Sequence, residues 1–235
     1  MNLRLPRASV NLKSALPLAL GLAFLFLAPY AVAAAKTPLP PATVDEMLSA
    51  ARGKQTAVFA GGCFWGTQSV FERVKGVLAT TAGYAGGSAS TATYPQVTTE
   101  TTGHAESVEV VYDPSRITYG QLLRIFFSVA HDPTQLNRQG PDVGNSYRSA
   151  IFYLSEDQRR IAAAYIAQLD SIKAFAKPIV TQLTPLQRFY RAEDYHQDYA
   201  LNHPDNPYIL VCDRPKIDAL KQQFPELFVD YKGKR

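Results

Sequence analysis

The chain has 235 residues, of which 46% are hydrophobic and 19% charged, with 24 Lys and Arg against 20 Asp and Glu. This composition excludes a disordered charged chain and a fibrous repeat, and the length suits one domain or two small ones. Three basic residues and no acidic residue stand in the first 35 positions, so the rest of the chain is close to neutral. We therefore expect no nucleic-acid partner. Two cysteines, Cys63 and Cys212, exclude a disulfide-rich scaffold.

Residues 1–35 have the layout of a signal peptide. Three basic residues precede an uncharged apolar stretch at 15–27, and small residues follow it. We expect cleavage after Ala33 or Ala35 and export to the periplasm, an oxidising compartment in which a free thiol needs a function. The alternative is an uncleaved membrane anchor, because the uncharged run at 15–35 is long enough to span a bilayer.

A linker and a short helix are expected at 36–54, ahead of a single catalytic domain at 55–235. The linker is rich in proline, and the pattern that follows predicts a helix capped by Thr43, with Asp45 and Glu46 in its first turn.

Farther along the chain, strands and helices alternate irregularly. Strands are predicted at 56–60, 77–81, 106–112, 147–154 and 179–183, and helices at 64–74, 118–130, 155–172, 194–201 and 216–223. Thr118 with Gln121 and Ser155 with Gln158 have the spacing of capping boxes at two helix starts. Long loops join several strands, which favours an α+β two-layer domain with C-terminal helices over a doubly wound sheet.

Cys63 stands in Gly61-Gly62-Cys63-Phe64-Trp65-Gly66, where the first strand turns into the first helix. The free N–H groups and the positive dipole end of a helix start lower the pKa of a thiol. The glycines permit a tight turn, and the two aromatic residues offer a small apolar pocket beside a nucleophile. The alternative is an inert cysteine in a packed core. Export to an oxidising compartment and the glycine frame favour the nucleophile.

The segment Gly62-Cys63-Phe64-Trp65-Gly66 resembles the signature of the peptide-methionine (S)-S-oxide reductases, the type A methionine sulfoxide reductases. The resemblance extends from about residue 55 to residue 224. Its further motifs lie at 83–87, 93–94, 103–106, 112–114, 131–133, 138–142, 147–151 and 195–199. It implies a ferredoxin-like core and a thiol-dependent reduction of methionine (S)-sulfoxide that needs no cofactor.

The resemblance also implies roles for individual residues. The cysteine at the Cys63 position attacks the sulfoxide sulfur, which yields methionine and a cysteine sulfenic acid. Glu106 corresponds to the acid that helps protonate the sulfoxide oxygen. Tyr94 and Tyr147 match the tyrosines that hold this oxygen by hydrogen bonds.

Three further residues are implied to bind the substrate. Phe64 and Trp65 match the aromatic residues that receive the methyl group on sulfur, and Asp142 matches an aspartate that positions the substrate. On its sequence context alone, in a loop of Gly, Pro and Asn, Asp142 is equally suited to turn formation.

The strand pattern supports Glu106 independently of the resemblance. With a period of two, Glu106 shares a strand face with Val108, Val110 and Tyr112, whereas Glu109 lies on the opposite face. A carboxyl group on an apolar face loses hydration, which raises its pKa and favours the neutral acid that can donate a proton. The alternative is that Glu106 ends the strand facing solvent.

The sulfenic acid must be reduced for turnover. Many family members use a second cysteine in a glycine-rich C-terminal tail, but Cys212 follows an apolar run at 208–211. Cys212 is therefore either a resolving cysteine or a small buried hydrophobic residue. In the second case an external thiol, such as a thioredoxin-like protein, reduces Cys63 directly. Apart from this reductant and oxidised methionine, free or in proteins, we expect no partner and a monomer.

Two other functions remain open at this stage. A Cys-His hydrolase would use Cys63 with His104, His131 or His196, and an aromatic binding module would need no chemistry at Cys63. A general disulfide exchanger is not supported, because the chain has no Cys-x-x-Cys pair. The histidines are scattered without the spacing of a zinc site, so no metal is expected.

Overall fold

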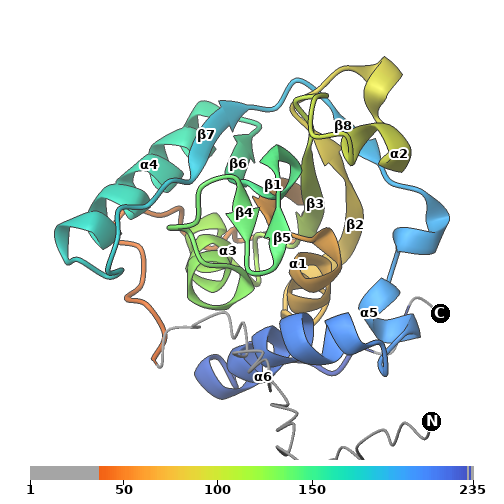
Figure 1. Cartoon of the computed structure of the whole chain (residues 1–235). Coiled ribbons are helices and arrows are strands. Elements are labelled where there is room, and N and C mark those ends of the chain that lie inside the picture. Colours follow the sequence, from red (N-terminus) through yellow and green to blue (C-terminus); the bar gives the residue numbers. More distant parts are fainter. Residues whose placement is uncertain (1–36, 232, 234–235) are drawn as a thin grey trace, which may run out of the picture.

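The computed structural model describes residues 37–231 and 233, so the proposed signal peptide lies outside the described residues. A curled six-stranded sheet forms the centre of the domain (Figure 1). Its strands are β1 (Gln55–Gly61), β2 (Val77–Ala85), β3 (Ala105–Tyr112), β6 (Ser149–Tyr153), β7 (Gln182–Pro185) and β8 (Phe189–Arg191). They lie in the order β7-β6-β1-β3-β2-β8, and all neighbours are antiparallel except β6 and β7. A separate hairpin pairs β4 (Arg138–Gln139) with β5 (Asp142–Val143).

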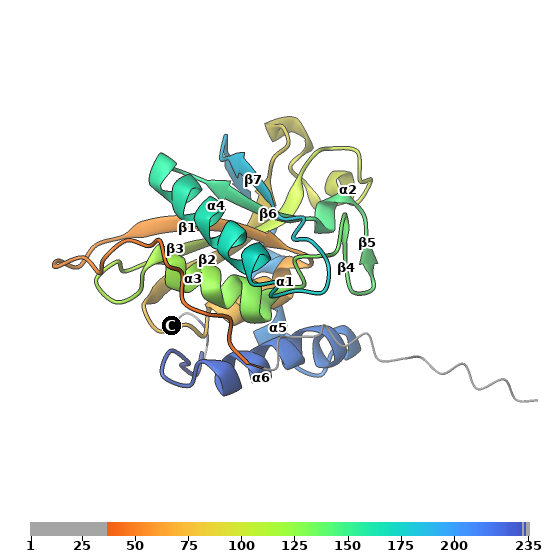
Figure 2. The same ribbon diagram turned by 90° about the vertical axis from the view of Figure 1, so that its left-hand side faces the viewer.

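The α-helices of the described residues are α1 (Phe64–Phe71), α2 (Tyr94–Val97), α3 (Tyr119–Ile125), α4 (Glu156–Ser171), α5 (Tyr199–Asn202) and α6 (Arg214–Gln223). Helix α1 packs against β1, β2 and β3, and α4 packs against β6 and β7. Short 3₁₀ turns occur at 89–91, 145–147 and 194–196, and π-helical turns at 126–130 and 209–213. Figure 2 shows α1 and α3 beneath the sheet and α6 beyond them, on the side away from the sheet. Within the described part of the chain, every helix is too short or too polar to cross a membrane.

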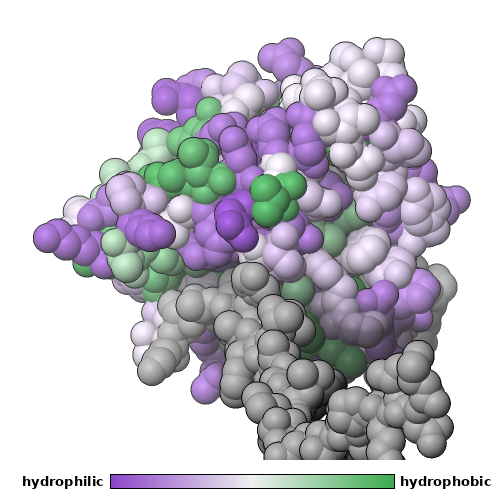
Figure 3. All heavy atoms as spheres, viewed as in Figure 1, coloured by the Kyte–Doolittle hydropathy of each residue, from purple (hydrophilic) through white to green (hydrophobic). Residues whose placement is uncertain are grey.

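The main core lies between the sheet and these helices. Phe59 of β1 stacks on Phe71 of α1 at 5.2 Å between ring centroids and on Phe126 at 4.9 Å. Val108 and Val110 of β3 are fully buried in the same cluster, as the period of two predicts. Because β3 pairs with β1, its apolar face lies above α1 and brings Glu106 to the start of that helix. On the face drawn in Figure 3, hydrophobic side chains form separate patches among hydrophilic ones.

The α+β class is confirmed, and most predicted elements exist with shifted ends. The predicted strand at 179–183 lies at 182–185, and the one at 147–154 begins only at Ser149, because residues 145–147 form a turn. The predicted helix at 194–201 is wrong as one element. It is interrupted at Asp198, whose left-handed φ of 53° separates a 3₁₀ turn from α5. The sequence pattern missed β4, β5, β8, α2 and the π-helical turn at 209–213, and it predicted residues 126–130 as a continuation of the preceding helix.

The short helix predicted behind Thr43 is wrong, because residues 43–54 form no helix. Its two acidic residues cap α3 instead. Asp45 Oδ1 accepts a hydrogen bond from the Gly120 N–H at 2.8 Å, and Glu46 Oε1 accepts one from the Tyr119 N–H at 3.0 Å. The free N–H groups and positive end of α3 thus attract carboxylates from a distant segment.

The two predicted capping boxes differ in outcome. The box of Thr118 and Gln121 at the start of α3 is confirmed in both directions. At α4, the Ser155 hydroxyl accepts from the Gln158 N–H, but the Gln158 side chain accepts from the Leu154 N–H rather than from that of Ser155. The second box is therefore only half formed.

We expect the Asp45→Ala variant to lose about 1–2 kcal/mol of unfolding free energy, because it leaves the Gly120 N–H and the Thr118 hydroxyl without their acceptor. Equilibrium denaturation in urea measures this loss. Asp205→Ala, at an exposed aspartate in a loop, is the matched control. Equal stabilities of the two variants would contradict the remote cap.

Candidate active site

Cys63 lies at the turn between β1 and α1, as predicted. It is the N-cap residue of α1 and is 8% exposed. The preceding Gly62 has a left-handed φ of 87°, and a Cβ atom there would lie 2.5 Å from the Gln139 side chain. Glycine is therefore required at this turn, which directs the Cys63 side chain into a pocket at the helix start.

Glu106 is buried beside Cys63, and the alternative of a solvent-facing strand end is wrong. Its Oε2 atom accepts a hydrogen bond from the Phe64 N–H at 3.0 Å, and the residue is only 3% exposed. Burial raises the pKa of Glu106 to about 8, while the Phe64 N–H and the neighbouring Cys63 thiol act in the opposite direction. Glu106 is therefore a neutral acid at pH 7, in line with its position on the apolar strand face.

The predicted lowering of the Cys63 pKa is wrong in its net sign. Burial raises the pKa of the thiol well above its ordinary value, and the carboxyl groups of Glu106, Asp213 and Asp142 add to this. The Trp65 N–H at the helix start lowers the pKa, as expected, but by less. Without substrate the thiol is therefore protonated. Its proton must leave as the sulfur reacts.

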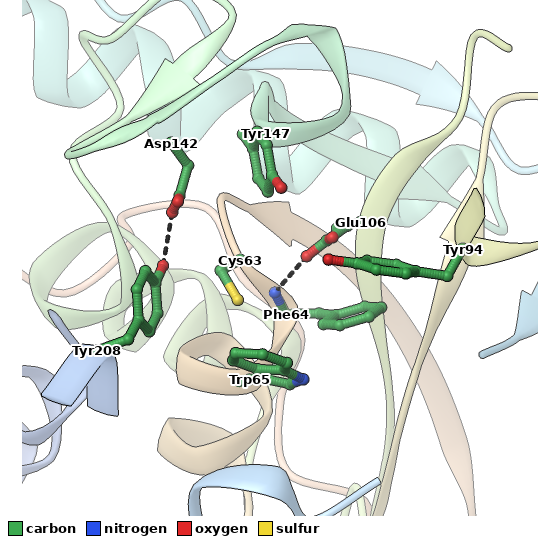
Figure 4. A pocket seen from close by; sticks show the side chains of 8 residues that line it. All are labelled: Cys63, Phe64, Trp65, Tyr94, Glu106, Asp142, Tyr147 and Tyr208. Atoms are coloured by element: carbon green, nitrogen blue, oxygen red, sulfur yellow. Dashed lines mark hydrogen bonds between the residues drawn. The ribbon is translucent and has the colours of Figure 1, made fainter. Parts of the chain in front are cut away.

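The pocket has a volume of about 180 Å³, which suits the end of a side chain rather than a large ligand. It brings together all the predicted site residues except Cys212 (Figure 4). The lining residues are Cys63, Phe64, Trp65, Tyr94, Glu106, Asp142, Tyr147 and Tyr208.

The aromatic side of the pocket is fixed by residues behind it. The Trp65 ring stacks on Tyr199 of α5 at 3.7 Å with an interplanar angle of 9°. Its Nε1–H donates to His196 Nδ1 at 3.2 Å, and the His196 ring also packs on Phe64 at 4.9 Å. Tyr199 lies in the 195–199 motif, but nothing in the sequence assigned it a contact with Trp65. His196 supports the rings of Trp65 and Phe64 from behind the pocket.

Two tyrosine hydroxyls point into the pocket near Glu106 (Figure 4). Tyr94 begins α2, and its N–H donates to Glu193 Oε1 at 2.9 Å. Tyr147 ends the turn at 145–147, which Glu100 holds by accepting from the Ser146 N–H and hydroxyl, both at 2.7 Å. Burial raises the pKa of both tyrosines, so both remain neutral O–H donors.

Asp142 reaches the pocket from β5, opposite Tyr94, and is not merely a turn residue. Its Oδ2 atom accepts a hydrogen bond from the Tyr208 hydroxyl at 2.5 Å. Burial raises the pKa of Asp142, whereas this bond and Lys216 lower it. Sequence reasoning missed Tyr208, because nothing in its local pattern distinguishes it among 13 tyrosines.

Cys212 lies apart from the pocket-lining residues. It belongs to the π-helical turn at 209–213, is 7% exposed, and is a free thiol like Cys63.

The histidines required by a Cys-His hydrolase also lie outside the pocket. Both ring nitrogens of His131 form hydrogen bonds, Nδ1 with the Phe126 carbonyl and Nε2 with the Ser149 hydroxyl. None of the four histidines lines the pocket.

A cysteine at a helix start, a neutral buried carboxylic acid, two tyrosine hydroxyls and an aromatic wall define a cysteine-dependent enzyme. Such a pocket suits a substrate with a small apolar group and an oxygen that accepts hydrogen bonds and a proton. Comparisons with known proteins identify the family. The family model described as "Peptide methionine sulfoxide reductase" matches residues 55–227.

Known relatives are similar in sequence over most of the chain. Peptide methionine sulfoxide reductase MsrA 2 of Mesorhizobium japonicum is 56% identical over 185 residues, which cover 79% of this chain and 94% of that protein. The protein of the same name from Synechocystis sp. is 50% identical, with 80% and 88% covered. The crystal structure of reduced Mxr1 from Saccharomyces cerevisiae is similar with a TM-score of 0.58 and 32% identity, covering 70% of this chain and 92% of that chain.

Methionine sulfoxide reductase A of Corynebacterium diphtheriae is similar with a TM-score of 0.56 and 34% identity, covering 74% of this chain and 89% of that chain. The chain belongs to the peptide methionine sulfoxide reductase family. Its activity is the thiol-dependent reduction of methionine (S)-sulfoxide. The hydrolase and the binding module are thereby excluded as its function.

Proposed function

We propose that Cys63 is the nucleophile of this reductase and that Glu106 is its acid. The observation that carries this proposal is the position of the Glu106 carboxyl group, which is bonded to the Phe64 N–H next to Cys63 and has a pKa of about 8. A neutral carboxylic acid at this position can give a proton to an oxygen that develops negative charge.

The reaction conserves atoms and electrons in the following way. Cys63 Sγ attacks the sulfoxide sulfur and forms a sulfur–sulfur bond, while the sulfoxide oxygen is protonated to a hydroxyl. The hydroxyl then passes from the substrate sulfur to Sγ. The sulfur–sulfur bond breaks with its electron pair on the substrate sulfur, and Cys63 is left as a sulfenic acid. Glu106 gives its proton to the sulfoxide oxygen and takes up the proton of the Cys63 thiol, which lies beside it in the pocket. The substrate sulfur is reduced to a thioether, and Cys63 is oxidised by two electrons.

Three subsites around the sulfur account for the choice of one epimer. The hydroxyls of Tyr94 and Tyr147 hold the oxygen, and the rings of Phe64 and Trp65 receive the methyl group. Asp142, held by Tyr208, faces the remaining substituent. Because oxygen, methyl group and main chain have separate places, the mirror-image sulfoxide would put its oxygen against the aromatic wall.

We expect Tyr94→Phe and Tyr147→Phe each to lower the rate of the reductase step by about tenfold, since each removes one O–H donor to a partly charged oxygen. Single-turnover kinetics with the (S)-sulfoxide measure this rate. Tyr153→Phe, on β6 and away from the pocket-lining residues, is the control. If Tyr94→Phe or Tyr147→Phe kept the rate of this control, the hydroxyl of that tyrosine would not bind the sulfoxide oxygen.

The sulfenic acid is reduced by thiols. Two external thiol groups convert it to the Cys63 thiol, with release of water and formation of one disulfide. We propose a thioredoxin-like protein as their source, because Cys212 lies outside the pocket and is buried. A resolving role of Cys212 stays a second option and requires the 209–213 turn to move.

We also propose that the protein is exported to the periplasm after removal of residues 1–35, because these have a signal-like sequence, and that it acts as a monomer.

We further infer a ferredoxin-like, two-layer core. Its support is the succession β1-α1-β2-β3-α3-β6, with strand order β6-β1-β3-β2 and both helices on one face.

The decisive experiment incubates the purified protein with each epimer of methionine sulfoxide and dithiothreitol. We expect methionine from the (S)-epimer only. Mass spectrometry after one turnover without reductant should then locate the added oxygen on Cys63. An oxygen or a new disulfide that does not involve Cys63 would overturn the proposed mechanism, whereas a Cys63–Cys212 disulfide would establish Cys212 as the resolving residue.

A further inference from the structure

Beneath the pocket lies a buried ion pair that the reaction described above does not use. Asp213 ends the 209–213 turn, and Lys216 lies in the first turn of α6. Lys216 Nζ lies 3.2 Å from Asp213 Oδ1, and the two residues are 3% and 0% exposed. The second carboxylate oxygen of Asp213, Oδ2, is buried without a hydrogen-bond partner among the described residues. Burying such a pair costs hydration energy that its attraction does not fully return.

The pair touches the helix that begins at Cys63. A Cβ atom on Gly66, the third residue of α1, would lie 2.0 Å from Asp213 Oδ1 and 2.6 Å from Lys216 Nζ. Only glycine leaves room for these charged atoms against the helix backbone. The second glycine of the Gly-Cys-Phe-Trp-Gly motif therefore admits a charged pair to the first turn of α1.

The same segment also reaches the pocket at its other end. Tyr208 directly precedes the 209–213 turn, donates to Asp142, and meets the Trp65 ring edge-on at 5.9 Å. One end of this turn thus lines the pocket, while its last residue is fixed under α1 by Lys216. Loss of the pair would release both contacts.

The groups that face Cys63 come from every element around it. They are Glu106 from β3, Asp142 from β5, Asp213 from the 209–213 turn, Tyr94 from α2, Tyr147 from the 145–147 turn, and Tyr208. Asp213 raises the pKa of the Cys63 thiol, after burial and Glu106. Lys216 offsets part of this negative charge, since it lowers the pKa of both Asp142 and Asp213.

We propose that Asp213 and Lys216 are positioning residues of the reductase, which fix the 209–213 turn against α1 and set the charge beneath the Cys63 sulfur. This inference rests on Cys63 being the nucleophile. The two members of the pair act on the thiol with opposite signs. Asp213 adds to burial and Glu106 in keeping the thiol protonated while the pocket is empty. Lys216 limits the effect of the Asp213 charge, so that the proton can still leave when substrate binds.

The test measures alkylation of Cys63 by iodoacetamide as a function of pH, quantified on the Cys63 peptide by mass spectrometry. In this reaction the thiolate sulfur bonds to carbon and iodide leaves, so the rate follows the thiolate fraction. At pH 7 we expect Asp213→Asn to alkylate about tenfold faster than the parent protein and Lys216→Met to alkylate more slowly. Asp218→Asn and Lys221→Met, at exposed positions of α6, are the controls and should match the parent.

If the pair were purely structural, both single variants would alkylate Cys63 faster than the parent, because loss of either charge would loosen the 209–213 turn and expose the thiol. That result, or parent-like profiles in both, would overturn the proposal. If a single variant does not fold, the double variant Asp213→Asn/Lys216→Met leaves no unpaired charge. The alkylation profile of the double variant should lie at lower pH than that of the parent, and a profile superimposed on the parent's would contradict the proposal. Alkylation requires no sulfoxide turnover, so failure of this inference is distinct from failure of the proposed mechanism.

Discussion

The Cys63→Ser variant is expected to show no measurable reduction of methionine (S)-sulfoxide, a loss of at least about 10⁴-fold. A serine hydroxyl is a far weaker nucleophile than a thiol and cannot form the sulfenic acid that carries the oxygen away. The substitution keeps the size and the N-cap position, and serine is a favourable N-cap residue, so folding should be preserved.

Cys212→Ser is the matched control, because it removes the other free thiol from a buried position outside the pocket-lining residues. In single-turnover assays it should form methionine at the parent rate. Equal activity of Cys63→Ser and the parent protein would end the case for thiol chemistry at this position. If Cys212→Ser formed no methionine in the first turnover, Cys212 rather than Cys63 would be the nucleophile.

The second large effect is expected for Glu106→Gln, which should slow the reductase step by about 10²–10³-fold at pH 7. Glutamine fills the same space and can still accept from the Phe64 N–H, but it has no acidic proton for the sulfoxide oxygen. Glu109→Gln, on the opposite face of β3, is the control and should keep the parent rate. A parent-like rate in Glu106→Gln would show that another group supplies the proton.

The pH dependence follows from the same carboxyl group. The pKa of Glu106 is about 8 in the folded protein, so the neutral acid predominates below this pH. The rate of the reductase step should fall as the pH rises through 8, and Glu106→Gln should lose this dependence. A descending limb that persists in the variant would assign it to a different group.

Stability gives an independent readout of that pKa. A carboxyl group whose pKa is raised by folding contributes stability below its unfolded pKa of about 4.5, and this contribution is lost as the pH rises towards 8. The unfolding free energy of Glu106→Gln relative to the parent should therefore increase between pH 5 and pH 8. Denaturation at several pH values measures the difference, and a constant difference would contradict a raised pKa.

Local sequence patterns determined much of this site. The glycine-framed turn placed Cys63 at the start of α1, because the strand-to-helix transition is encoded within a few residues. The period of two on β3 placed Glu106 on the buried face. Tyr94, Tyr147 and Asp142 came only from the family resemblance, since long loops carry no pattern that predicts where their side chains meet.

Interactions between distant segments decided the rest. Asp45 and Glu46 have the sequence signature of their own helix start, yet they cap α3, because its free N–H groups lie within reach only in the folded chain. Tyr208 joins the pocket through Asp142, and Asp213 reaches α1 because Gly66 leaves room for it. None of these contacts has a local signal, since the partners are separated by dozens of residues.

The sequence by itself determined the chemistry of this protein: a cysteine at a helix start, an acid on an apolar strand face, and the family to which both belong. Only the tertiary structure decided the protonation state of the thiol. The helix start lowers the pKa of Cys63, but burial and carboxyl groups from β3, β5 and the 209–213 turn raise it more. Electrostatic effects in a buried site sum over all nearby groups, whereas a sequence motif contains only those that are adjacent along the chain.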